Sequence, residues 1–177
     1  MRIAVKWGTI LALSVTLWTA AVHLVGIYTV HIEYAKFVDI AAIALPLAAL
    51  TLALTDQRRA LNDTLPFGRG VLTGVAVAAV AAPITVATLW YYHHYVNPEW
   101  LSLLVAYEQQ TLNATGLTAD QVAARIAALQ RSGGDQQQIV GGLIGTLATG
   151  LALSVVITPA LGLLRRMQRR SLRGRDT

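Results

Sequence analysis

The chain has 177 residues, of which 55% are hydrophobic and only 13% are charged, and its net charge at pH 7 is +5. Soluble domains have about 25% charged residues, so this composition argues against a soluble protein and favours one that lies in a lipid bilayer. The sequence contains no cysteine, which excludes disulfides, thiolate catalysis, iron–sulfur clusters and cysteine-ligated zinc. We expect the basic residues to contact anionic lipid, and we expect no nucleic-acid partner.

Four long apolar stretches predict an all-α integral membrane protein with four transmembrane helices. A spanning helix needs about 20 apolar residues, and the stretches cover residues 7–30, 37–55, 70–95 and 139–164. The first stretch follows Arg2 and Lys6 as a signal peptide would, but it is longer than the roughly 7–15 apolar residues of a signal. We therefore predict an uncleaved first helix and a single membrane domain over residues 1–177.

The positive charges predict which way the chain crosses the bilayer. Of the fourteen Lys and Arg residues, only Lys36, Arg125 and Arg131 lie outside the N-terminus, the gap between the second and third stretches, and the tail at 165–177. Cytoplasmic segments carry the excess of Lys and Arg, and an even number of spans puts those three places on one side. The expected location is the bacterial inner membrane, with both termini in the cytoplasm.

The segment between the third and fourth stretches, residues 97–138, predicts an extracytoplasmic helical hairpin. Pro98 favours a helix that runs to about Leu112, because proline is tolerated in a first helical turn. Thr118 and Gln121 have the spacing of a capping box for a second helix. That helix presents one apolar face, made by Val122, Ile126 and Leu129.

Three prolines lie within the predicted spans, namely Pro46, Pro83 and Pro159. Each removes a backbone donor and can kink its helix. Proline is nevertheless common in membrane helices, so a gating role and a purely structural role both remain open.

Short motifs in a fixed order resemble a known family. They read VKWG at 5–8, LPFGRG at 65–70, YVNPEW at 95–100 and GLT at 116–118, before a fourth helix that ends in paired arginines. This order resembles a bacterial four-helix membrane family known as domain of unknown function 4199. The resemblance implies an inner-membrane protein with no assigned activity, and it supplies no catalytic residue.

The histidines are the candidates for cofactor or metal binding. His23 lies late in the first predicted helix, while His93 and His94 lie late in the third, so their imidazoles could ligate haem or a metal. His31 and Glu33 are the further metal candidates. The alternative is that these histidines are hydrated groups among interfacial aromatics. We expect no cofactor, with haem or metal as the exception.

Small residues at spacings of four predict close contacts between helices, because they let backbones approach in lipid. They fall in the third and fourth predicted helices, at Gly70, Gly74, Gly141, Gly142, Gly145, Thr146 and Gly150. Their contacts either hold the bundle together or form a face for self-association or a partner subunit. The lipid head-group candidates are Arg58, Arg59, Arg69, Arg165 and Arg166.

Charge is missing from the middle of every predicted span, which argues against proton relays and ion pathways. Asp39 comes closest to an exception, and the helical spacing to Glu33 and Lys36 predicts a surface ion pair there. No catalytic triad, phosphate loop or metalloprotease motif occurs. The sequence therefore favours a non-enzymatic accessory or assembly subunit, or a small homo-oligomer. The alternatives are a transporter or channel for a small or lipid-like solute, and a haem or metal protein.

Overall fold

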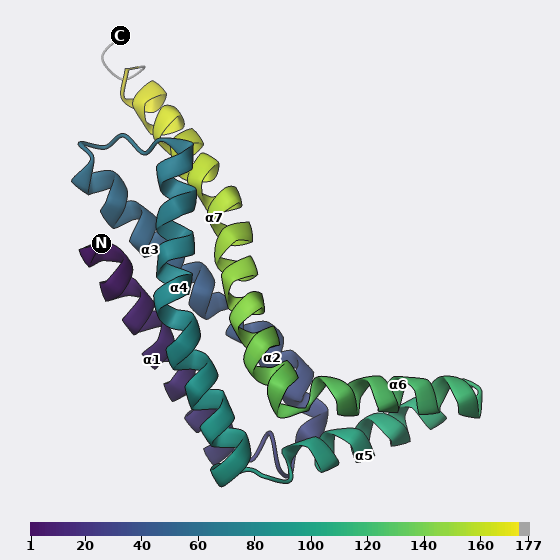
Figure 1. Ribbon diagram of the computed structural model, residues 1–177. Coiled ribbons are helices and arrows are strands. Elements are labelled where there is room, and N and C mark those ends of the chain that lie inside the picture. Colours follow the sequence, from purple (N-terminus) through teal and green to yellow (C-terminus); the bar gives the residue numbers. More distant parts are fainter. Residues whose placement is uncertain (174–177) are drawn as a thin grey trace. The chain divides into compact units, whose positions relative to one another are not determined.

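The computed structural model describes the backbone of residues 1–173 and the side chains of residues 1–163 (Figure 1). The described backbone is helical. In chain order its elements are α1 (Arg2–Leu24), the 3₁₀-helix η1 (Ile32–Tyr34), α2 (Ala35–Ala42), α3 (Ala44–Ala60), α4 (Phe67–Tyr91), the π-helix η2 (Tyr92–Val96), α5 (Trp100–Asn113), α6 (Ala119–Ser132) and α7 (Asp135–Arg173).

Four helical segments are long and apolar enough to cross a membrane. They are Arg2–Leu24, Ile32–Ala60, Phe67–Val96 and Asp135–Leu163. The prediction of an all-helical chain with four potential spanning helices is therefore confirmed. Length and hydropathy, which the sequence displays directly, decide this feature.

The chain divides into two compact units. Unit 1 comprises Met1–Ala12, Ala44–Ala82 and Gly145–Thr177, and unit 2 comprises Leu13–Ile43 and Pro83–Ile144.

Close approach of helices forms the core of unit 1. A Cβ atom on Gly74 would lie 2.4 Å from the Cβ of Ser154, and one on Gly150 would lie 2.4 Å from the Cβ of Ala78. Only glycine permits α4 and α7 to lie this close, and the short distance improves dispersion contacts between them. Leu50 and Val77 are almost completely buried in the same unit.

The second predicted span is not one continuous helix. The structure ends α2 at Ala42 and begins α3 at Ala44. Pro46 explains the break, because its ring has no N–H to donate to the carbonyl of Ala42 and would clash with that carbonyl in a regular helix. Pro83 and Pro159 lie inside α4 and α7 without ending them. Pro83 also marks a boundary between the two units.

In unit 2, α5 and α6 pack side by side as a helical hairpin (Figure 1). The predicted capping box forms at the start of α6: Thr118 Oγ1 accepts from the Gln121 amide, and Gln121 Oε1 accepts from the Thr118 amide. Gly116 has a φ of +72° in the turn between the helices, a conformation that glycine adopts without strain. On the apolar face of α6, Val122 is buried.

Candidate functional site

A group of aromatic and polar side chains gathers in unit 2 around the π-helix that ends α4. The Asn97 amide donates to the Tyr92 carbonyl at 2.9 Å, which closes a turn one residue wider than that of an α-helix. Such π-turns are rare in α-helices and are found frequently at functional sites. Here the wide turn brings Tyr92 and Asn97 into one hydrogen-bonded group.

Asn97 is the centre of this group and is only 5% exposed. Its Nδ2 donates to the Tyr92 hydroxyl at 3.4 Å and to the Tyr28 carbonyl at 3.2 Å. The Tyr92 hydroxyl also lies 2.9 Å from Nδ1 of His23. Because the hydroxyl accepts from Asn97, its own proton is available to His23, and a neutral His23 then carries its proton on Nε2.

Tyr28 and Asp39 extend the group toward α2. The Tyr28 hydroxyl donates to Oδ1 of Asp39 at 2.6 Å. Burial raises the pKa of the Tyr28 hydroxyl above its ordinary value, and the hydrogen bond and negative charge of Asp39 raise it further. Tyr28 therefore remains a neutral donor at physiological pH, and one carboxylate oxygen of Asp39 is occupied.

A cavity of about 270 Å³ opens beside these residues, and all of its lining belongs to unit 2. Its polar and aromatic lining includes Tyr28, Asp39, Tyr92, His93 and Trp100, and aliphatic side chains form most of the rest. A mainly apolar cavity with a few convergent polar groups is the usual form of a small-molecule site.

Each predicted histidine ligand has a polar partner of its own. His93 Nδ1 lies 3.0 Å from Oε1 of Gln138, and its ring stacks on Trp100 with centroids 4.2 Å apart. His94 Nε2 lies 3.4 Å from Oδ2 of Asp135. His23 contacts Tyr92 instead, so the three predicted cofactor ligands have three different partners.

His31 and Glu33, the predicted metal ligands, have side chains that are both about half exposed, and Nδ1 of His31 lies 3.7 Å from Oε1 of Glu33. Within residues 1–163, no group of three or more His, Cys, Asp or Glu side chains is arranged to hold a metal ion. The structure thus gives these two residues an ion-pair geometry with each other.

The ion pair predicted near Asp39 involves a different acidic residue. Lys36 pairs with Glu108 of α5 rather than with Asp39 or Glu33. Sequence spacing within one helix could not reveal this partner, because Glu108 comes from a distant part of the chain. The consequence is that Asp39 faces the cavity without a lysine.

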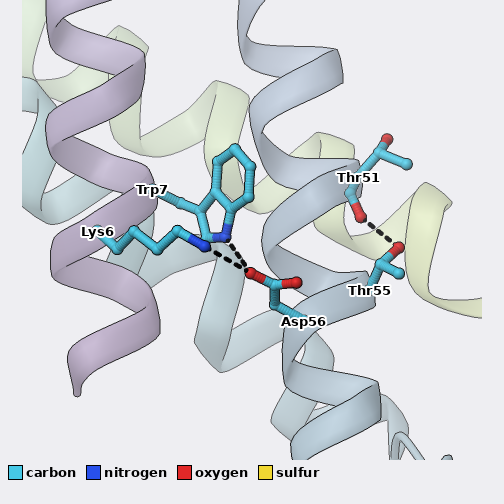
Figure 2. A network of polar contacts seen from close by, with 5 residues as sticks. All are labelled: Lys6, Trp7, Thr51, Thr55 and Asp56. Carbon is cyan, nitrogen blue, oxygen red and sulfur yellow. Dashed lines mark hydrogen bonds and ion pairs between the residues drawn. The ribbon is translucent and has the colours of Figure 1, made fainter.

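Unit 1 has its own polar network, which joins α1 to α3 (Figure 2). Oδ2 of Asp56 accepts from Lys6 Nζ at 3.0 Å and from Trp7 Nε1 at 2.9 Å. The Lys6 ammonium also lies 4.7 Å from the centre of the Trp7 ring, where a cation–π attraction acts. Each of the three side chains has a partner within the network, so the network joins α1 to α3 and contributes to stability.

The predicted lipid-contact arginines are found in different surroundings. Arg58 Nε lies 3.8 Å from Asp63 Oδ1, and Arg69 lines a surface hollow of about 450 Å³ in unit 1. Arg59 lies in the last turn of α3. The side chains of Arg165 and Arg166 lie outside the described residues.

Five members of the unit 2 site were not predicted as site residues: Tyr28, Asp39, Tyr92, Asn97 and Trp100. Two signals for them exist in the sequence. Asp39 is an ionisable residue close to the start of a span, and Asn97 and Trp100 belong to the YVNPEW segment. Neither signal shows that the residues meet, because they come from separate elements.

Comparisons with known proteins give one family. A family described as "Protein of unknown function (DUF4199)" matches residues 6–161. No curated protein and no solved structure matches the chain significantly.

Proposed function

We propose, from the premise that the chain belongs to the DUF4199 family of proteins of unknown function, that it is a non-enzymatic membrane protein that packs against another spanning helix. It would act as an accessory or assembly subunit of a membrane complex, or as a small homo-oligomer. The observation that carries this proposal is an exposed face of small residues along α7.

Within unit 1 this face consists of Gly145, Ala148 and Ala152, which are three and four residues apart and are all exposed. A Cβ atom on Gly145 would meet nothing within 4 Å. Small residues in lipid favour close helix packing. An exposed glycine in a span has no side chain with which to make dispersion contacts to lipid tails, whereas a larger side chain makes many.

The other sides of α7 have different side chains. One side packs inside the units, where Gly142 approaches Val86 and Gly150 approaches Ala78. A third side of the same segment carries large exposed aliphatic residues, which suit lipid, namely Leu147, Leu151 and Val155. Over residues 145–152 the division into large and small exposed faces supports a helix partner on the small one, and the exposed Val156, one turn beyond Ala152, marks the end of the small face.

A pair of matched substitutions tests this proposal. Gly145→Leu adds bulk to the small face, whereas Gly162→Leu adds the same bulk to the aliphatic face, seven residues beyond Val155. Neither position has an atom within 4 Å of an added Cβ, so both variants should fold. Native mass spectrometry after gentle detergent extraction should show loss of oligomer or copurified subunit for Gly145→Leu alone. Equal assemblies in both variants, or a wild-type protein that is monomeric and without a partner, would contradict the proposal.

We further propose that the protein lies in the bacterial inner membrane with both termini cytoplasmic and the α5–α6 hairpin extracytoplasmic. The sequence ranges of unit 1 contain eleven of the fourteen Lys and Arg residues and three acidic residues, whereas unit 2 contains three basic and six acidic residues. This partition supports the orientation, because cytoplasmic segments are enriched in Lys and Arg.

The absence of cysteine makes the orientation simple to test, since each introduced thiol is the only one. Thr64→Cys lies in the connection from α3 to α4, and Ala123→Cys lies on an exposed position of α6. A membrane-impermeant maleimide should label Ala123→Cys in spheroplasts and Thr64→Cys only after lysis. The reverse pattern would refute the orientation.

A further inference from the structure

Asp39 is the acidic residue in the lining of the unit 2 cavity, and the described residues of that lining include no Lys or Arg. Oδ1 of Asp39 accepts from Tyr28, whereas Oδ2 has no hydrogen-bond or ion-pair partner within the described part of the chain. The nearest lysine in sequence, Lys36, is engaged by Glu108.

Asp39 is exposed at the start of a membrane helix, so its carboxylate is accessible to a ligand and attracts a positive charge. The protein supplies one donor, the Tyr28 hydroxyl, to one oxygen. The second oxygen is therefore available to a ligand that carries a hydrogen-bond donor or a positive charge.

Aromatic rings line the same cavity as this carboxylate. Tyr28 and Tyr92 meet edge to face with their centroids 6.4 Å apart, and Trp100 forms a further part of the lining. The faces of Trp and Tyr rings attract organic cations, and several rings around one site form the usual cage for substituted ammonium groups. Such a cage suits an organic ammonium better than a bare metal ion, which takes oxygen ligands in larger number.

The size of the cavity limits what enters it. One water takes about 30 Å³ of liquid volume, so a cavity of about 270 Å³ holds a head group rather than a whole lipid. Leu89 and Leu104 provide an apolar wall for the carbon atoms next to the charged group.

We propose that this cavity binds an organic ammonium group, with the cation against Oδ2 of Asp39 and between the rings of Tyr28, Tyr92 and Trp100. The ammonium belongs either to the head group of an aminophospholipid or to a free amine of similar size. This site is independent of the α7 face, and the two can fail separately.

The first test varies the ligand and leaves the protein unchanged. Choline and 3,3-dimethylbutan-1-ol have nearly the same shape, but only choline carries the positive charge. Binding to the purified full chain in maltoside detergent is measured by tryptophan fluorescence and by microcalorimetry. Choline should bind with a dissociation constant at least about tenfold lower than that of the alcohol, as a partly desolvated cation requires. Equal binding of the two compounds, or binding of neither, would overturn the proposal.

The second test varies the protein. Asp39→Asn keeps the shape and an acceptor for Tyr28 but removes the charge, and it should raise the dissociation constant of choline at least about tenfold. Glu33→Gln is the control, because Glu33 is a carboxylate of the same unit that is not part of the lining. Circular dichroism and gel filtration establish that both variants fold. An Asp39→Asn variant that binds as the wild type does, or a Glu33→Gln variant that loses binding equally, would refute the role of Asp39.

The source of the ammonium is decided in nanodiscs that contain equal amounts of phosphatidylethanolamine and phosphatidylglycerol. Native mass spectra that retain phosphatidylethanolamine on the wild-type chain, but not on Asp39→Asn, identify a lipid head group. Choline binding without such an adduct identifies a free amine. Preferential retention of phosphatidylglycerol would contradict a cation site.

Discussion

The close contact of α4 and α7 makes the effect of Gly74→Ala calculable. The added Cβ would lie 2.4 Å from the Cβ of Ser154 and 3.2 Å from the carbonyl oxygen of Gly150. Carbon atoms in contact prefer about 3.5–4.0 Å. The Cβ atoms are fixed to the backbones, so rotation of a side chain cannot relieve the clash, and the helices must separate by about 1 Å. Overpacking of this kind costs about 1–3 kcal/mol.

The assay is the free energy of unfolding in mixed micelles as the mole fraction of SDS increases, followed by circular dichroism. Gly68→Ala is the control, because an added Cβ at Gly68 meets nothing within 4 Å. Alanine there should leave stability unchanged or raise it by up to about 1 kcal/mol, since glycine is the poorer helix former. Glycine-to-alanine substitution at these two positions of α4 is therefore expected to change the free energy of unfolding in different directions.

A second substitution checks the cause. Ser154→Gly removes the side-chain atoms with which the new methyl group clashes. The double variant should therefore lose less free energy of unfolding than the two single variants lose together. If Gly74→Ala unfolds at the same SDS fraction as the wild type, or if Ser154→Gly gives no rescue, the close α4–α7 contact is not as described.

Three further changes have definite expected results. Trp7→Phe removes the Nε1 donor to Asp56 and should lower the free energy of unfolding by about 1 kcal/mol, measured by the same SDS titration; no loss would mean that the bond is not formed in the membrane. Thr118→Ala removes the cap of α6 and should cost about 1 kcal/mol of local stability, seen as faster amide exchange in the first turn of α6, which Thr118→Ser should prevent. Tyr28 has a raised pKa in the folded protein, so its contribution to stability is complete below about pH 10, the usual tyrosine value, and is lost as the pH rises above it. Stability of the wild type should consequently fall more steeply above pH 10 than that of Tyr28→Phe, and equal slopes would contradict the shift.

The helices could be predicted from the sequence because their signals are local. Length and hydropathy located the four spanning segments, and the Thr118–Gln121 spacing located the start of α6. The break at Ile43 was missed, although Pro46 is visible in the sequence. Pro83 and Pro159 lie inside continuous helices, so proline alone does not tell which helix will end.

The candidate site was only partly predictable. The histidines drew attention to the end of α4 that lines the cavity, and the structure shows that His23 contacts Tyr92 while His93 contacts Gln138 and Trp100. Asp39 could be assigned to a helical ion pair from spacing alone, and that assignment was wrong because Lys36 has a better-placed partner in α5. An ion pair between two helices depends on which helices the tertiary fold brings together, and no local sequence pattern encodes this.

The sequence by itself therefore determined that this chain is an apolar helical protein with four segments long and apolar enough to span a membrane, and with eleven of its fourteen positive charges in three places. It could do so because hydropathy and charge act through short stretches of chain. The tertiary structure alone decided which glycines pack and which remain exposed, since Gly74 and Gly145 have the same chemistry but different neighbours. It also brought Asp39, Tyr28 and Tyr92 to one cavity. These residues come from α2, from η2 and from the turn between α1 and η1, and only packing fixes the distances between such segments.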